Sequence, residues 1–191
     1  MTTLPPFPPP PAGFAPPSAP GLTLTPCRPA DLPFLHRLYR STREDEMAAT
    51  GWDAGFVRTF CDQQFAAQHR DWIGRFPAAA FLLIRRGRDP VGRLYVDAAP
   101  AALHVIDISL TPAVRGRGFG TALLTALIGQ AAAGGRIVTL AVDPLNQRAR
   151  SLYRRLGFRE TGRSPSRLTL SHPGDSNGLA QPGAPMLGSV G

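Results

Sequence analysis

The residues most suited to chemistry begin with a glycine-rich turn, Arg115-x-x-Gly118-x-Gly120, which follows an apolar run and opens a helix-like stretch. Glycine lets a backbone approach a ligand closely, and the first turn of a helix carries unpaired N–H groups with a partial positive charge. Such a turn suits a pyrophosphate, and Arg115 and Arg117 add positive charge beside it. The same pattern also occurs in plain strand-to-helix connections.

A dinucleotide-binding turn is the nearest alternative, because Asp143 follows the next predicted strand at about the distance expected of a ribose-binding acid. The glycine spacing of that fingerprint does not fit. Counted from Gly116, the third glycine of GxGxxG would fall at Thr121, and counted from Gly118 it would fall at Leu123.

A second set of residues follows one helix and one strand later, as Asn146-x-x-Ala149-x-x-x-Tyr153-x-x-x-Gly157-Phe158. Seven residues make close to two helical turns, so Asn146 and Tyr153 are expected on one face. A phenol has a pKa of about 10, stays protonated, and can donate to a developing thiolate. A tyrosine at helical spacing is by itself more often part of a core, so it is the pairing with the glycine-rich turn that favours chemistry.

These two motifs, in this order and separation, resemble motifs A and B of the GNAT N-acetyltransferase family. The resemblance covers residues 106–162, and the predicted order of elements extends it across the folded part. It implies an acyl-CoA-dependent N-acetyltransferase that moves the acetyl group of acetyl-CoA to an amine by direct attack in a ternary complex. A non-catalytic acetyl-CoA-binding sensor or regulatory module is the alternative.

The resemblance also implies roles for individual residues. Tyr153 is expected to be the general acid, and the backbone N–H of Leu110 is expected to stabilise the oxyanion at the thioester carbonyl. Coenzyme A is expected to contact the end of the preceding strand, the glycine-rich turn and the second motif, at Ile108, Leu110, Thr111, Arg115, Gly116, Arg117, Gly118, Gly120, Thr121 and Asn146.

An attacking amine must be neutral, so an acceptor of high pKa needs a base. His104 and Asp107 lie on the strand where members of the family often carry one. Because side chains alternate along a regular strand, these two residues are expected on opposite faces, and we place His104 first. Acidic residues of the segment that joins the first helices, Glu44 and Glu46, come after them. The acceptor site is expected between those helices, with walls from Tyr39, Trp52, Phe60 and Gln64.

The elements that must position these residues follow from hydrophobic periodicity and turn residues. We predict a strand at 22–25, helices at 31–40 and 53–76, strands at 80–85, 91–96 and 103–110, a helix from the glycine-rich turn to Gly134, a strand at 136–142, a helix at 144–157, and strands at 158–161 and 167–170. The second helix is expected to have a break, and Leu145 is expected to face inward. The order β-α-α-β-β-β-α-β-α-β-β predicts an α/β fold with a mixed, mostly antiparallel central sheet flanked by helices.

Length and composition suit one domain, since the chain has 191 residues of which 43% are hydrophobic. A proline-rich leader at 1–21 and a tail at 172–191 are expected to be disordered, on either side of an N-acetyltransferase domain at 22–171. The sequence contains no apolar run long enough to span a bilayer and no pattern typical of a secretory signal. We expect a soluble cytoplasmic protein, as a monomer or homodimer.

The formal net charge of +8 comes from arginine alone, because the chain has no lysine. Such a charge is compatible with nucleic-acid binding, but the arginines are scattered and are not interleaved with aromatic residues, so a nucleic-acid partner is not expected. Cys27 and Cys61 have no ligand-like spacing, and no metal site is expected.

Overall fold

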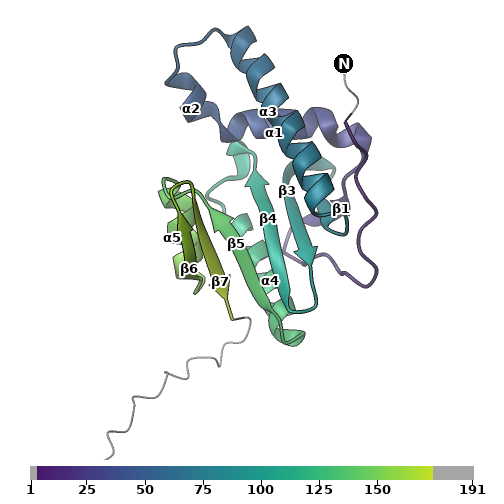
Figure 1. Ribbon diagram of the computed structural model, residues 1–191. Coiled ribbons are helices and arrows are strands. Elements are labelled where there is room, and N and C mark those ends of the chain that lie inside the picture. The colour runs from purple at the N-terminus through teal and green to yellow at the C-terminus, as the bar shows by residue number, and fades with distance from the viewer. Residues whose placement is uncertain (1–3, 174–191) are drawn as a thin grey trace, which may run out of the picture.

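Apolar strands in the middle of the chain build a seven-stranded sheet, which the computed structural model describes within residues 4–173 (Figure 1). The strands are β1 (Thr23–Pro26), β2 (Ala80–Arg86), β3 (Asp89–Ala98), β4 (Ala102–Leu110), β5 (Ile137–Val142), β6 (Arg159–Ser164) and β7 (Arg167–His172). The helices are α1 (Leu32–Thr42), α2 (Glu44–Ala48), α3 (Ala54–Arg75), α4 (Phe119–Ala133) and α5 (Gln147–Arg155). The predicted tail begins inside β7, and its residues from 174 onward lie outside the described range.

The strand order is β1-β2-β3-β4-β5-β7-β6, and every neighbouring pair is antiparallel except β4 with β5. This confirms the predicted mixed, mostly antiparallel sheet. One hydrophobic cluster lies on the face covered by α4 and α5, and a second lies on the face covered by α1 and α3 (Figure 1). No helix among the described residues is long and apolar enough to cross a membrane.

The helices differ from the prediction in three ways. Helix α3 is continuous over its 22 residues, without the expected break, and Asp53 begins it by accepting the N–H groups of Gly55 and Phe56 at 2.9 and 3.0 Å. Helix α2 forms inside the segment expected to be a linker. Leu145 is 86% exposed, because it lies in the turn before α5, where its N–H donates to Asp143 at 2.7 Å.

Strand β4 contains a β-bulge that changes which side chains share a face. Tyr95 of β3 pairs with Asp107, but the next residue of β3 pairs with Val105, so Ile106 is an extra residue on β4. As a result, His104 and Asp107 both face the helix α3 side, where His104 stacks on Phe76 with ring centroids 5.9 Å apart. The prediction that they face opposite sides is therefore wrong, because it assumed a regular strand.

The proline-rich leader is packed against the domain, in contrast to the disorder expected for it. His69 of α3 donates from Nε2 to the Pro5 carbonyl at 2.8 Å, and the Phe7 ring contacts His69 edge-on with centroids 4.8 Å apart. Further along, Ala19 is buried in the cluster on the other face of the sheet, with Phe14 beside it. Proline loses little backbone entropy on folding because its φ angle is already fixed, so a few buried side chains are enough to hold residues 4–21 in place.

We expect Phe7→Ala to lower the free energy of unfolding by about 2 kcal/mol, because Phe7 is half-buried against the rings of His69 and Phe81. Urea unfolding would measure the change. Ser18→Ala, at an exposed position of the same segment, is the control and should leave the midpoint unchanged. Equal stability of the Phe7 and Ser18 variants would contradict the packing of the leader.

Candidate active site

Strands β4 and β5 pair only at their beginnings and then part. Their parallel pairing runs from Ala102 opposite Ile137 to Val105 opposite Leu140, whereas β4 continues to Leu110. The outer half of β4 therefore has backbone groups on its β5 side that no strand among the described residues pairs with. This opening lies beside the beginnings of α4 and α5.

The ladder between β3 and β4 shows which N–H groups face the opening. The Thr111 N–H donates to the Val91 carbonyl at 2.9 Å, and the preceding residue, Leu110, lies opposite Gly92 of β3. Hydrogen bonding alternates along an antiparallel ladder, so the N–H groups of Leu110 and Ile108 face away from β3. Both N–H groups therefore point into the opening, where a ligand could accept hydrogen bonds from them. The Thr111 amide does not, because it is bonded to β3.

The glycine-rich turn leads directly from this strand into α4. Gly116 and Gly118 have φ angles of +78° and +82°, which only glycine adopts readily. No side chain of the described part of the chain caps the helix at Gly118. The N–H groups of the first helical turn, which includes Gly120 and Thr121, therefore point outward. Arg117 and Thr121 are exposed at this turn. A helix start of this kind attracts an anion.

The turn, β4 and α5 converge at Gly120. A Cβ atom placed there would lie 3.9 Å from Leu110 and 4.0 Å from Leu152, the residue before Tyr153. Tyr153 is 8% exposed, and its ring packs edge-on against Phe158. Burial, followed by the negative charge of Asp107, raises the pKa of Tyr153 to about 12, so its hydroxyl is protonated at neutral pH.

Asn146 begins α5 as its N-cap. Its Oδ1 accepts the Ala149 N–H at 3.0 Å, which satisfies one of the unpaired donors of the helix. Of the groups expected to meet coenzyme A, the Asn146 side chain therefore already has a structural partner. Asn146 precedes the helical residues, so it does not share a regular helical face with Tyr153.

Asp107 is held by a buried arginine that sequence analysis did not single out. Arg93 of β3 is 3% exposed and donates from Nε to Asp107 Oδ2 at 2.7 Å and from Nη2 to Gln68 at 3.0 Å. Its guanidinium lies over Trp72, 5.0 Å from the ring centroid, and Ser109 donates to the same Asp107 oxygen at 2.8 Å. Asp107 Oδ1 accepts no hydrogen bond within residues 4–173. The carboxylate is thus fixed with one oxygen unused.

His104 lies in the other half of β4. It pairs with Thr139 where β4 and β5 are still joined, and its Nδ1 shares a hydrogen bond of 2.9 Å with the Thr139 hydroxyl. Burial lowers the pKa of His104, so the ring is neutral near pH 7. Asp107 thus lies in the unpaired part of β4, where its charge affects Tyr153, whereas His104 lies in the paired part.

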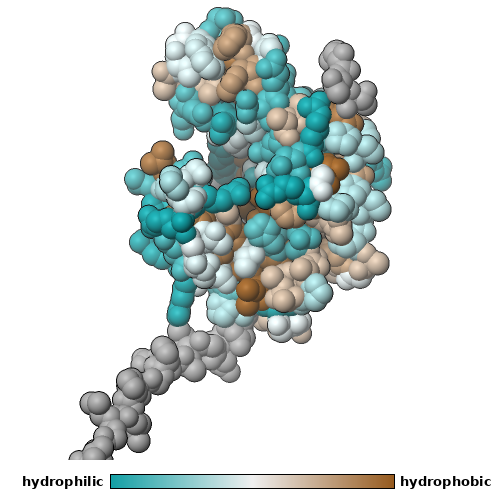
Figure 2. Space-filling model, in the orientation of Figure 1, coloured by the Kyte–Doolittle hydropathy of each residue, from teal (hydrophilic) through white to brown (hydrophobic). Residues whose placement is uncertain are grey.

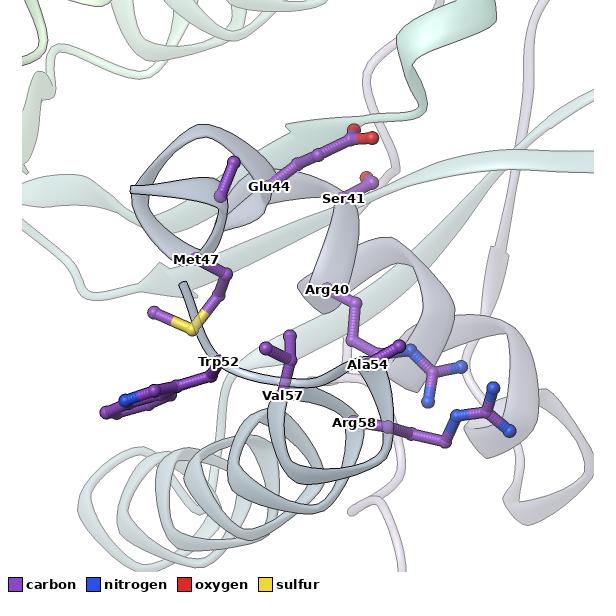
Figure 3. Close-up of a pocket in the computed structure, with 9 residues that line it drawn as sticks. Arg40, Ser41, Glu44, Met47, Trp52, Ala54, Val57 and Arg58 are labelled. Carbon is purple, nitrogen blue, oxygen red and sulfur yellow. The ribbon is translucent and has the colours of Figure 1, made fainter. Parts of the chain in front are cut away.

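A cavity of about 640 Å³ lies between α1, α2 and the start of α3 (Figure 3). Its lining is mainly apolar around Met47, Trp52 and Val57, while the guanidinium groups of Arg40 and Arg58 lie together on another side. The full lining is Arg40, Ser41, Glu44, Met47, Ala48, Trp52, Ala54, Val57 and Arg58. Figure 2 shows the surface indented between the part formed by α2 and α3 and the part formed by α5. Of the walls predicted from the sequence, Trp52 alone lines this cavity.

The Arg115 side chain connects the cavity to the end of β4. Its Nε donates to the Leu110 carbonyl at 2.8 Å, and its Nη2 donates to the carbonyl and hydroxyl oxygens of Ser41 at 3.1 and 3.2 Å. The Arg115 side chain is therefore bonded to the protein, and so is its N–H, which donates to the Pro112 carbonyl at 3.2 Å. The sequence carries no signal for this tertiary contact. For Arg93 a signal exists, although sequence analysis did not single it out: an arginine within the apolar run of β3 is a charge that needs a partner.

A family model described as "Acetyltransferase (GNAT) family" matches residues 35–158. The match extends from α1 to the end of the second motif and includes the opening, the glycine-rich turn and Tyr153. The chain belongs to the GNAT acetyltransferase family.

Solved structures of this family have the same fold. PaiA N-acetyltransferase from Thermoplasma acidophilum, solved in complex with coenzyme A, is 16% identical, with a TM-score of 0.60 over 80% of this chain and 98% of that one. An acetyltransferase from Thermus thermophilus is 22% identical, with a TM-score of 0.59 over 80% and 96%. The ribosomal-protein-S18-alanine N-acetyltransferase from Escherichia coli is 19% identical, with a TM-score of 0.54 over 84% and 98%. At these identities the likeness establishes the fold.

Proposed function

We propose that this protein is an N-acetyltransferase that transfers the acetyl group of acetyl-CoA directly to an amine in a ternary complex. The observation that carries the proposal is the convergence, around Gly120, of the unpaired end of β4, the open start of α4 and the helix that bears Tyr153. The similar protein from Thermoplasma acidophilum was solved with coenzyme A, which supports the same donor here.

In this proposal the opening between β4 and β5 receives the pantetheine arm, and the glycine-rich turn receives the pyrophosphate. The amine nitrogen attacks the thioester carbonyl carbon, and the N–H of Leu110 stabilises the oxyanion that forms. As the C–S bond breaks, the Tyr153 hydroxyl gives its proton to the thiolate and later regains one from solvent. No covalent intermediate with the enzyme is needed.

Asp107 is proposed to accept the proton that the amine loses, directly or through a water molecule. Its fixed carboxylate has a free oxygen and its charge reaches Tyr153, whereas His104 lies in the paired part of the strand. The cavity lined by Met47, Trp52 and Val57 is proposed to hold the body of the acceptor. Its lining favours an amine attached to an apolar group.

Release of free thiol from acetyl-CoA by the purified protein, read against polyamines, amino acids, aminoglycosides and peptides with free N-termini, tests the proposal. Release that depends on one class of amine is expected. Binding of acetyl-CoA without release for any amine would favour a sensor, and no binding would overturn the proposed activity.

We expect Asp107→Asn to lower kcat by about 100-fold, because the amide cannot accept the amine proton. His104→Gln is the comparison and should keep kcat within about threefold. Both are measured by thiol release with the amine found above, after thermal melting shows that each variant is folded at the assay temperature. A larger loss for His104→Gln than for Asp107→Asn would assign the base to His104 instead.

A further inference from the structure

Besides Arg117, which is exposed within the glycine-rich turn, two arginines lie at this turn in different surroundings. Arg115, the first residue of the motif, is half-buried and donates to three protein oxygens, on Leu110 and Ser41. A phosphate would have to compete with these acceptors for its guanidinium. The Arg115 side chain, which the motif would suggest first as the phosphate ligand, is therefore already hydrogen-bonded to the end of β4 and to the last turn of α1.

The second arginine, Arg148, comes from the first turn of α5 and occupies none of the specified positions of the second motif. It is exposed, and within residues 4–173 it makes no hydrogen bond or ion pair, as is also true of the Arg117 side chain. A Cβ atom placed on Gly116 would lie 3.4 Å from Nη2 of Arg148, so this guanidinium lies against the first glycine of the turn. The guanidinium of Arg148 is thus available to a ligand that binds at the backbone of Gly116.

The charges around the turn would favour an anion between these groups. Burial, followed by the positive charge of Arg148, lowers the pKa of Arg115, although Glu44 and Asp45 act in the opposite direction. The guanidinium of Arg148 lies against Gly116, the residue next to Arg115, so the two like charges are close to each other. The outward N–H groups at the start of the 15-residue helix α4 add positive potential from the opposite side of the turn. A pyrophosphate at this place would relieve the repulsion and would meet donors from two elements.

On the basis of the proposed function, we propose that Arg148 binds the pyrophosphate of coenzyme A across Gly116, and that Arg115 is a positioning residue. Arginine suits this task, because its planar fork pairs with two phosphate oxygens at once. Arg115, through its bond to the Leu110 carbonyl, fixes the backbone whose N–H faces the thioester. Its bonds to Ser41 hold the wall of the cavity next to the reacting groups.

Calorimetric titration of the full chain with coenzyme A, at low and at physiological salt, tests the division between the two arginines. Arg148→Gln is expected to weaken binding by about tenfold and to reduce its dependence on salt, because one charge-assisted contact is lost. Arg148→Lys should recover part of the affinity. Arg155→Gln, an equal charge change at the other end of α5, is the matched control and should stay within about twofold.

Arg115→Gln is expected to keep the affinity for coenzyme A within about threefold while lowering kcat by about tenfold or more, the split expected of a positioning residue. Two further probes locate the contact of Arg148. With 3′-dephospho-coenzyme A, which retains the pyrophosphate, Arg148→Gln should cause the same loss. With pantetheine, which has no phosphate, it should cause none.

Several results would overturn the inference. An unchanged affinity of Arg148→Gln for coenzyme A would remove Arg148 from the site, and a loss as large for Arg115→Gln would return the phosphate to Arg115. A loss that disappears with 3′-dephospho-coenzyme A would assign Arg148 to the 3′-phosphate. If the unaltered chain fails to bind coenzyme A at all, the proposed function itself fails, and this outcome is distinct from the others.

Discussion

Tyr153→Phe is expected to lower kcat by about 10²- to 10³-fold, while the affinity for acetyl-CoA changes by less than about threefold. The substitution removes only the hydroxyl, so the ring still packs against Phe158 in the cluster beside α4. Without that proton, the thiolate must leave unprotonated, which raises the barrier for C–S cleavage. Thiol release with the preferred amine measures kcat, and calorimetry with acetyl-CoA measures binding.

Tyr39→Phe provides the matched control, because it removes the same hydroxyl from a buried tyrosine of the other cluster and should leave kcat within about twofold. Since burial and the charge of Asp107 raise the pKa of Tyr153 to about 12, its acid form persists as pH rises. Between about pH 7 and 10, which lies below this pKa, activity should therefore show no fall from ionisation of Tyr153. Equal rates for the Tyr153 and Tyr39 variants would remove Tyr153 from the mechanism.

Arg93→Met is expected to lower the free energy of unfolding by about 3 kcal/mol or more, because it leaves the Asp107 carboxylate without its buried partner. Gln68 loses its hydrogen bond from Arg93 in the same variant, which adds to the cost. Unfolding in guanidinium chloride, followed by circular dichroism, measures the change.

A double-mutant cycle separates the ion pair from the packing of the arginine. Arg93→Met combined with Asp107→Asn should cost less than the sum of the two single changes, because no unpaired charge is left behind. Arg163→Met removes an exposed partner of Glu160 and should have no measurable effect. Strict additivity of Arg93→Met and Asp107→Asn would mean that the pair at 2.7 Å contributes no coupling.

The order of the elements was predictable because each strand and helix of this chain carries its own local signal. Turn glycines at Gly87 and Gly134 separate apolar runs of different period, and the structure places strand and helix boundaries close to them. The glycine-rich turn and Tyr153 were found in the same way. Both depend on spacing within a single stretch of chain, and the structure brings them together at Gly120.

Features set by tertiary contacts were not predictable. One extra residue at Ile106 turns Asp107 to the same side as His104, and no residue type in the strand indicates a bulge there. The engagement of Arg115 by Ser41 joins residues 74 positions apart, which spacing within a motif cannot reveal. The leader was misjudged because its composition is typical of disorder, although Phe7 and Phe14 are the anchors that hold it.

The leader also affects how the molecule comes apart. Its two ends are anchored in different hydrophobic clusters, Phe7 on the side of α3 and Ala19 on the side of α4, so one peptide segment ties together layers that the sheet otherwise keeps separate. Loosening either layer releases contacts that the other layer depends on. Opening of the two layers is therefore cooperative, which favours a single unfolding transition over an intermediate in which only one layer has melted.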